Sequence, residues 1–246
     1  MSFSLYPIPH APALWIHDLK MLVLADLHIG IENELKKHGV QVASQTIQMK
    51  KKLYHLCSRY EPESIILLGD IKHSIPATPF QEKKELYDFL KGLADFAPIH
   101  IIPGNHDGSI KHFIPDDIIL HPSGGYLREN IGFLHGHRWP KKSLMNAEFL
   151  FFGHSHPTIM LSDRLKYQNF EPCWVKTSLL KEKTKERYER FDRELTVLVF
   201  PAFNPLCGGT AVNKDGLVGP LQKIIDLPDA EIFLLDGTDL GKVKRI

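Results

Sequence analysis

Cysteine is scarce in this 246-residue sequence, which contains only Cys57, Cys173 and Cys207 and no C-x-x-C pair. This wide spacing excludes a disulfide framework and a cysteine-rich zinc ribbon. An odd number of cysteines is typical of proteins in a reducing compartment. We therefore expect a cytoplasmic protein.

Long apolar runs are also absent. No uninterrupted run approaches the roughly 18 apolar residues of a membrane-spanning helix, and residues 1–10 lack the charged and apolar regions of a signal peptide. Neither sign of charge is in excess, because 30 Lys+Arg balance 29 Asp+Glu. We expect no membrane association and no global field that attracts polyanions, although a local basic patch could still bind nucleic acid.

Histidine, by contrast, is abundant, with 14 residues. Its imidazole is the commonest metal ligand and the commonest acid–base group, so the positions of these histidines matter. The length allows one large domain, and we find no repeat or linker that would divide it. We predict a single domain over residues 1–246, with an irregular, Gly- and Pro-rich C-terminal extension at about 203–246 that closes with a short strand.

Short apolar runs bounded by Gly, Pro or Asp alternate with helical patterns. Apolar residues recur at helical spacing in two segments, Ser44–Tyr60, where Ser44 could cap the helix, and Phe80–Phe96. Glu182–Arg193 is densely charged and predicts a solvated helix or excursion. Alternating strands and helices indicate an α/β fold. The predicted strands are Leu14–His17, Lys20–Ala25, Ser64–Leu68, Ile99–Ile102, Ile131–Leu134, Phe149–Phe152, Pro157–Leu161, Leu195–Phe200 and Glu231–Leu235.

Polar signatures follow five of these runs. In open α/β sheets, ligands bind beyond the carboxyl ends of the strands, so neighbouring strands would bring these signatures together. Glycine in four of them allows a sharp turn and a close approach to a ligand. The signatures are Asp26-Leu27-His28, Gly69-Asp70, Gly104-Asn105-His106-Asp107, His135-Gly136 and Gly153-His154-Ser155-His156.

The residue types in these signatures suit a pair of metal ions. The carboxylate, amide and imidazole groups together fit Mn, Fe or Zn better than Mg or Ca. In D-x-H and H-x-H, the one-residue spacer lets two side chains leave a strand end on the same side. Seven ligands suffice for two ions if one carboxylate bridges them, and Asp70 is our choice for the bridge. The candidate ligands are Asp26, His28, Asp70, Asn105, His135, His154 and His156.

This order of motifs over about residues 20–160 resembles the calcineurin-like metallophosphoesterase superfamily. The resemblance implies a sandwich of two mixed β-sheets flanked by helices. It also implies that Asp26, His28 and His156 hold one ion, that Asn105, His135 and His154 hold the other, and that Asp70 bridges them. His106 would face the substrate phosphate without binding metal.

The expected reaction is hydrolysis of a phosphodiester by a hydroxide that bridges two divalent ions, most readily Mn. In this scheme His106 stabilises the charge on phosphate or protonates the leaving group, and Asp107 orients His106. We also expect His73 and His137 as substrate contacts, with turn capping or a supporting role as the alternatives. Arg138 and Trp139 could contact substrate as well, but structural packing is favoured for both.

Within the superfamily, Gly30-Ile31-Glu32 and Gly39-Val40-Gln41 resemble an archaeal and bacterial branch near the DNA-ligase-associated phosphoesterases. The chain is more distantly similar to the Mre11-like nucleases, which also carry a histidine three residues after the bridging Asp. This similarity implies a nuclease acting on DNA or RNA and, by analogy alone, a helicase or ligase as partner.

Two other functions remain open. A phosphomonoesterase could use the same metals on a small metabolite. An inactive scaffold that binds partners is disfavoured, because all seven candidate ligands and His106 are present. The sequence leaves the oligomeric state undetermined.

Overall fold

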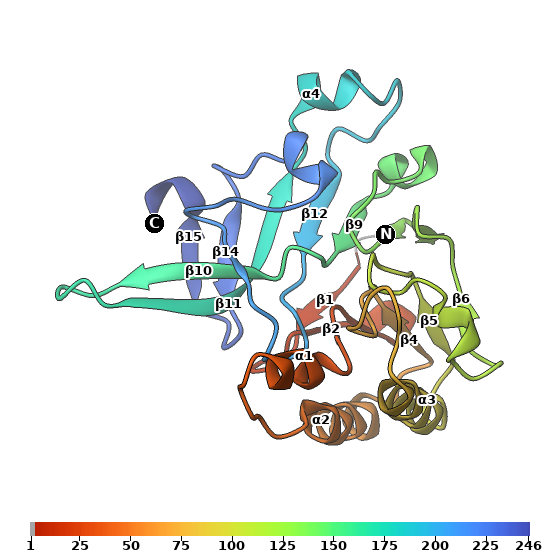
Figure 1. Cartoon of the computed structure of the whole chain (residues 1–246). Helices are drawn as coiled ribbons and strands as arrows, with labels where there is room; N and C mark the ends of the chain where they lie inside the picture. Colours follow the sequence, from red (N-terminus) through yellow and green to blue (C-terminus); the bar gives the residue numbers. More distant parts are fainter. Residues whose placement is uncertain (1–2) are drawn as a thin grey trace.

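Two mixed β-sheets stack face to face in the computed structural model, which describes residues 3–246 (Figure 1). The first sheet has six strands in the order β1-β2-β3-β4-β5-β6. Neighbours from β1 to β3 are antiparallel, and those from β3 to β6 are parallel. Its strands are β1 (Leu5–Pro7), β2 (Ala13–Ile16), β3 (Met21–Leu24), β4 (Ser64–Leu67), β5 (Ile99–Ile101) and β6 (Ile119–Leu120).

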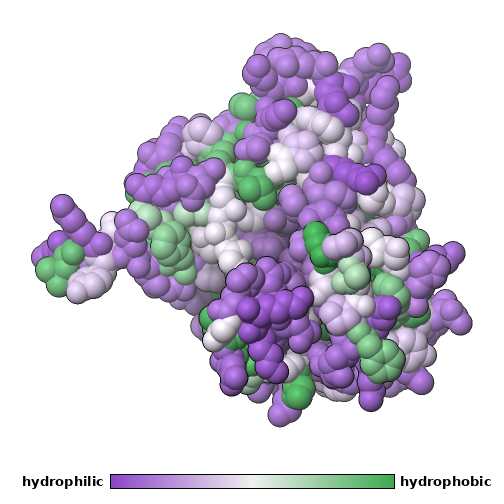
Figure 2. Space-filling model, in the orientation of Figure 1, coloured by the Kyte–Doolittle hydropathy of each residue, from purple (hydrophilic) through white to green (hydrophobic). Residues whose placement is uncertain are grey.

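The second sheet has nine strands in the order β13-β10-β11-β12-β9-β8-β7, with β14 paired to β11 and β15 paired to β14. The long strand β11 pairs first with β10 and then with β12 and β14. Its outer half and β10 form a hairpin that projects from the body (Figures 1 and 2). The strands are β7 (Tyr126–Arg128), β8 (Ile131–Phe133), β9 (Phe149–Phe152), β10 (Pro157–Ser162), β11 (Gln168–Ser178), β12 (Thr196–Val199), β13 (Thr210–Ala211), β14 (Glu231–Leu234) and β15 (Asp239–Lys242).

Two of the helices are those expected from apolar periodicity. In α2, Met49, Leu53 and Leu56 are buried along one face, as i, i+4, i+7 spacing requires. Ser44 occupies the N-cap position, but its side chain makes no capping hydrogen bond, contrary to expectation. No helix within the described residues is both long and apolar enough to cross a membrane. The helices are α1 (Ile31–Lys37), α2 (Gln45–Tyr60), α3 (Phe80–Ala94) and α4 (Lys181–Lys185), with 3-10 turns η1 (His17–Leu19), η2 (Ile110–His112), η3 (Lys142–Asn146), η4 (Pro220–Lys223) and η5 (Val243–Arg245).

Alternating residues of the first sheet divide its core into two layers. Leu22 and Leu24 of β3 pack with α2 and α3 on the outer face. Val23 of β3, between them, points instead to the second sheet, where it joins Phe151 and Trp174. Because both faces are covered, these strands are apolar throughout, which explains why they were predicted from continuous runs. The expected sandwich of mixed sheets is confirmed.

The outer face of the second sheet is covered mainly by the C-terminal extension and by short helical turns. Val212, Leu221, Ile224 and Ile232 of that extension are buried against β9 and β12 residues. The predicted strand at 231–235 is present as β14, but β13 and β15 are additional, so the extension is less irregular than expected. The C-terminal extension therefore packs against the second sheet as part of the same hydrophobic core.

The charged segment 182–193 was expected as a solvated helix or excursion. Only a short helix, α4, forms there, and it ends at Lys185. Its lysines pair locally, with Lys183 3.2 Å from Glu186 and Lys185 2.6 Å from Glu182. Exposed pairs of this kind contribute little stability, but they neutralise the segment.

Candidate metal centre

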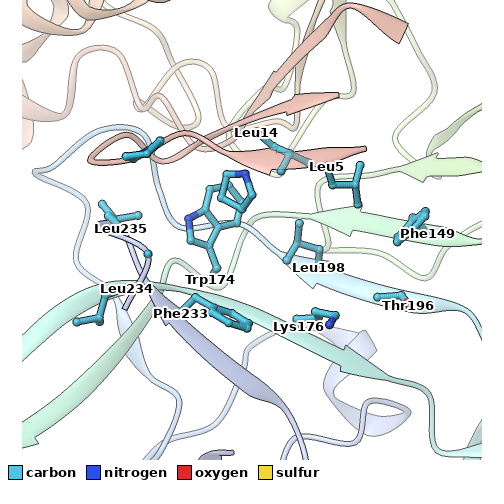
Figure 3. A pocket seen from close by; sticks show the side chains of 13 residues that line it. Leu5, Leu14, Phe149, Trp174, Lys176, Thr196, Leu198, Phe233, Leu234 and Leu235 are labelled. Carbon is cyan, nitrogen blue, oxygen red and sulfur yellow. The ribbon is translucent and has the colours of Figure 1, made fainter. Parts of the chain in front are cut away.

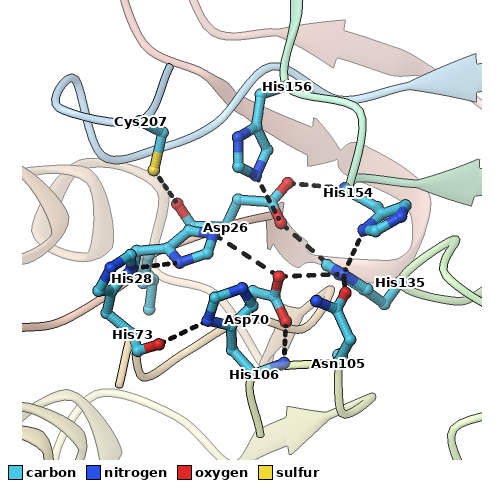
Figure 4. A network of polar contacts seen from close by, with 12 residues as sticks. Asp26, His28, Asp70, His73, Asn105, His106, His135, His154, His156 and Cys207 are labelled. Carbon is cyan, nitrogen blue, oxygen red and sulfur yellow. Dashed lines mark hydrogen bonds and ion pairs between the residues drawn. The ribbon is translucent and has the colours of Figure 1, made fainter. Parts of the chain in front are cut away.

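The seven candidate ligands come from the carboxyl ends of strands in both sheets. The parallel strands β3, β4 and β5 end just before three of the polar signatures, and the parallel strands β8 and β9 end just before the other two. Figure 4 shows the side chains from the two sheets converging on one pocket. The residues that meet there are Asp26, His28, Asp70, Asn105, His135, His154 and His156.

Three buried side-chain atoms that could ligate a metal ion lie on one side of the pocket. None of them has a hydrogen-bond partner among the described residues. They are Asp26 Oδ1, His28 Nε2 and His156 Nε2. His156 Nε2 lies 3.3 Å from Asp26 Oδ1, and its Nδ1 donates to the Gly208 carbonyl, so Nε2 carries the lone pair. Buried polar atoms without partners are costly, and a cation among them would satisfy all three. The donor set therefore fits a metal ion.

A second group of donors surrounds His135 Nε2. This nitrogen lies 3.2 Å from Asn105 Oδ1, 3.1 Å from His154 Nδ1 and 3.3 Å from Asp70 Oδ2. His135 Nδ1 donates to the Leu68 carbonyl, which again leaves Nε2 as the ligating atom. Ligand atoms of Asp70, His135 and His154 all lie within 4.8 Å of one another, so this second group could also hold a cation.

Asp70 Oδ2 belongs to both groups. It lies 3.3 Å from His135 Nε2 and 3.6 Å from His28 Nε2. Asp70 Oδ1 instead accepts a hydrogen bond from the His106 amide at 2.8 Å, which fixes the carboxylate plane. One oxygen of Asp70 can therefore face both groups at once.

The pocket favours positive charge at its centre. Burial alone would raise the pKa of Asp70, but contact with His135 more than offsets this and holds the pKa well below its usual range. Burial opposes charge on His135 too, yet Asp70 and Asp26 raise its pKa to about 9. His28 and His154 lie farther from these carboxylates, and burial lowers their pKa values to about 3 and about 4. His28 and His154 are thus neutral, as metal ligation requires, whereas His135 holds a proton that a bound cation would displace.

Five of the seven residues adopt left-handed backbone conformations that side chains other than glycine rarely take. Their φ angles are 58° at Asp26, 41° at His28, 47° at Asp70, 66° at His154 and 42° at His156. Such conformations cost free energy and occur most often at functional sites. The backbone strain is thus located at the turns that place the candidate metal ligands in the pocket.

Close packing behind the ligands fixes Asp26. Its Oδ2 atom accepts a hydrogen bond from the His154 amide at 3.0 Å. A Cβ atom at Gly153 would lie only 2.4 Å from this Oδ2, so only glycine permits the contact. Gly153, in the G-H-x-H motif after a strand of the second sheet, therefore allows the His154 backbone to contact the carboxylate of Asp26, which follows a strand of the first sheet.

Asp107 does not orient His106, so this expectation is wrong. The Asp107 carboxylate is buried and accepts backbone hydrogen bonds from Ile71 at 2.9 Å, Lys72 at 3.3 Å and Gly104 at 2.8 Å. Burial, followed by the nearby charge of Asp70, raises its pKa to about 6. Through these hydrogen bonds Asp107 joins the loops after β4 and β5, which carry the candidate ligands Asp70 and Asn105.

His106 and His73 lie together at the edge of the pocket. Their rings stack with centroids 5.4 Å apart, and His106 Nδ1 donates to the His73 carbonyl at 2.5 Å. His73 Nδ1 lies 3.1 Å from His28 Nδ1, and its Nε2 contacts Glu34 of α1. Both histidines predicted to touch substrate are thus placed beside the donor groups.

His137 lies on the other side, with its ring 5.2 Å from that of His135 and 6.2 Å from that of His154. Burial lowers its pKa to about 4. Trp139 packs under the Arg187 guanidinium, whose Cζ lies 4.2 Å from the ring centroid, and against the Tyr188 ring. For Trp139, the favoured interpretation of structural packing agrees with the structure.

The C-terminal extension contributes contacts that the sequence did not reveal. Asn204 is buried and donates to the carbonyls of Leu27 and His28 at 2.8 and 3.4 Å. Cys207 Sγ lies 4.0 Å from the Asp26 carbonyl, and it can join His28 and His156 as a third potential ligand. No motif spacing connects these residues to the D-x-H turn, so only the fold places them there.

Buried Glu82 of α3 supports the same pocket from behind. Its Oε1 accepts the His73 and Ser74 amides at 3.1 and 2.9 Å. A polar residue in the first turn of an amphipathic helix is usually solvated, so no sequence pattern indicates this role.

Comparison with known proteins identifies the family. Residues 19–169 match the calcineurin-like phosphoesterase superfamily domain, and the chain belongs to this superfamily. Its members are metal-dependent phosphoesterases, a chemistry that agrees with the donor groups described above.

Two relatives frame the resemblance. Seventy residues are 37% identical to the serine/threonine-protein phosphatase CPPED1 of Danio rerio, a match that covers 28% of this chain and about a fifth (21%) of that protein. The crystal structure of the Pseudomonas putida nuclease MPE superposes with a TM-score of 0.60 over 97% of this chain and 100% of that one, at 20% identity. The second comparison shows a common fold across nearly the whole chain, the C-terminal extension included.

Proposed function

We propose that this protein is a phosphodiesterase that uses two divalent ions, and that it acts as a nuclease. The observation that carries the proposal is the shared position of Asp70 Oδ2, which faces His28 Nε2 on one side and His135 Nε2 on the other. Paired ions about 3.5–4 Å apart clamp the attacking and leaving oxygens of a phosphoryl transfer. A single carboxylate oxygen between two donor groups supports that arrangement.

The donor chemistry supports Mn as the preferred ion, with Fe or Zn as alternatives. Asp26, His28 and His156 would hold one ion, and Asn105, His135 and His154 the other, with Asp70 between them. Oxygen and imidazole donors in this mixture suit borderline cations better than Mg or Ca. When bound, the ions would supply charge neutralisation and an activated water.

The protein's own contribution is positioning. Because His106 Nδ1 is engaged by the His73 carbonyl, Nε2 is the nitrogen left to contact a phosphate oxygen or the leaving group. His73 holds His106 from one side, while His137 lies across the pocket beside His135. A phosphate between them would meet histidines on two sides, which stabilises developing negative charge.

The chain shares its fold, over nearly its whole length, with the Pseudomonas putida nuclease, and this similarity supports a diester substrate. The second candidate is a phosphomonoesterase acting on a small molecule, and the shorter match to a protein phosphatase supports only the monoester part of it. Both activities would use the same donor groups and differ only in what the surrounding loops admit.

A substrate panel tests the proposal. The Mn-loaded protein is assayed with a bis-aryl phosphodiester, an aryl phosphomonoester, and single- and double-stranded DNA and RNA. We expect turnover of the diester and of at least one nucleic acid, and loss of both in His106→Ala with metal content unchanged. His112→Ala, at a histidine outside the pocket, is the matched control. Preferential turnover of the monoester would instead establish the phosphomonoesterase.

A further inference from the structure

A second cavity, unrelated to the histidine cluster, lies between the two sheets. Its volume is about 450 Å³, within the range of small-molecule sites. Leu5 and Leu14 of the first sheet form one wall, and Trp174, Leu198 and Phe233 of the second sheet form the other (Figure 3). The walls are almost wholly apolar.

The cavity lies away from the candidate metal centre. Phe149 and Thr196, which line it, are the first residues of β9 and β12. His154 and His156 follow the opposite, carboxyl end of β9. A ligand in this cavity would therefore not contact the donor groups.

One polar atom of a residue that lines the cavity lacks a partner. Trp174 is 1% exposed, and its indole Nε1 makes no hydrogen bond within the described part of the chain. Figure 3 shows the ring standing among the lining side chains, with its nitrogen on the side that faces Leu235. A buried N–H group without an acceptor is unfavourable, and an acceptor atom supplied by a ligand would satisfy it.

The charge of the wall is already neutralised. Among the described residues that line the cavity, Lys176 alone is charged, and its Nζ lies 3.0 Å from Glu231 Oε2. An anionic ligand would have to compete with this carboxylate and lose its own hydration in an apolar space.

From these observations we infer that the cavity binds a neutral, apolar molecule that carries one oxygen acceptor for the indole N–H of Trp174. A ketone or ester attached to an aromatic or acyl body has this chemistry. The site is independent of the proposed phosphodiesterase activity.

Three compounds with a common naphthalene body test the inference. 2-Acetonaphthone offers a neutral acceptor, 2-ethylnaphthalene offers none, and 2-naphthoate offers a charged one. In calorimetric titrations of the full chain, we expect the ketone to bind most tightly and the hydrocarbon roughly five-fold more weakly, the equivalent of one neutral hydrogen bond. The carboxylate should bind most weakly.

Substitutions then identify the site. Trp174→Phe keeps a ring but removes the donor, so the preference for ketone over hydrocarbon should disappear. Thr196→Phe narrows the cavity and should weaken all three compounds. Trp139→Phe, which removes an indole packed under Arg187, is the matched control and should bind as the native chain does.

Selective ¹⁵N labelling of tryptophan gives a readout that does not depend on a folded Trp174 variant. The chain has three tryptophans, Trp15, Trp139 and Trp174, and Phe variants of the first two assign the third by difference. The Trp174 indole cross-peak should move downfield with the ketone and not with the hydrocarbon. An unmoved cross-peak, equal affinities for ketone and hydrocarbon, or no binding of any compound would overturn the inference.

Discussion

The side-chain amide of Asn204 donates a 2.8 Å hydrogen bond to the carbonyl of Leu27, although 177 residues separate the two in the chain. Leu27 lies between the two candidate ligands of the D-x-H turn. The bond therefore ties the start of the C-terminal extension to the turn that presents Asp26 and His28. Through this contact, the extension becomes part of the metal centre's support.

We predict that Asn204→Ala lowers the free energy of unfolding by about 1–3 kcal/mol, because it leaves buried carbonyls without their donor. It should also weaken binding of the ion assigned to Asp26 and His28 more than binding of the other ion, as measured by Mn titration. Asn213→Ala is the matched control, since Asn213 accepts a hydrogen bond from the Met160 amide and donates one to the Met160 carbonyl, outside the pocket. Equal losses of metal affinity in both variants would refute a specific role for Asn204.

Asp107→Ala should lower the free energy of unfolding by about 3 kcal/mol or more, because two buried amides and one part-buried amide lose their acceptor. Urea titration measures this loss. Asp163→Ala removes a carboxylate that accepts two amides in an exposed turn, at Leu165 and Tyr167, and should cost less than about 1 kcal/mol. If the Asp107 variant matched this control in stability and lost only turnover, the original catalytic assignment would be restored.

Gly30→Ala should destabilise the protein more than Gly39→Ala. Both residues have positive φ, +97° and +81°, so each substitution carries a backbone penalty of about 1 kcal/mol. A Cβ at Gly30 would also lie 2.4 Å from Glu82 Oε2, whereas Gly39 has nothing within 4 Å. Displacing buried Glu82 should add about 1–3 kcal/mol. The comparison of the two melting curves isolates the Glu82 contact, and identical curves would show that this contact is unimportant.

The stacked pair His100 and His121 should make the fold sensitive to acid. Burial and the adjacent His100 lower the pKa of His121 from 6.5 to about 4. The unfolded chain therefore binds a proton at this residue between pH 6.5 and pH 4 that the folded chain does not. Stability contributed by His121 is complete above pH 6.5 and falls as the pH drops towards 4.

His121→Gln removes this component, so its Tm should fall less between pH 6.5 and pH 4 than that of the native chain. The buried histidines of the metal centre remain in the variant and leave a residual acid dependence. His55→Gln, at an exposed position of α2, is the control and should follow the native profile. A profile of His121→Gln that coincides with the native one would contradict the prediction.

The sequence predicts those strands that are buried on both faces and those helices that are buried along one face. β3, β4 and β9 are covered on both faces and so appear as apolar runs, and α2 and α3 show helical periodicity. The candidate ligands were found for the same reason, since each polar signature interrupts an apolar run. A candidate metal ligand can therefore be predicted from local sequence when it directly follows the apolar run of its own strand.

Other elements depend on tertiary contacts. α1 has a single buried residue, Ile31, and β11 begins with the polar residues Gln168, Asn169 and Glu171 because this half lies in a projecting hairpin. Neither has a recognisable periodicity, so neither was predicted. Asp107 bonds to backbone amides 35 and 36 residues away, and Asn204 bonds to carbonyls 176 and 177 residues away, distances that no local pattern encodes.

The left-handed backbone at Asp26, His28, Asp70, His154 and His156 has a consequence for how this chain can change over evolutionary time. Glycine at any of these positions would relax the turn while deleting a donor atom. Loss of the ligand should therefore be partly compensated by easier folding of the metal-free chain. A lineage released from selection for catalysis would be expected to drift towards glycine at these positions first, and to remain folded as it did so.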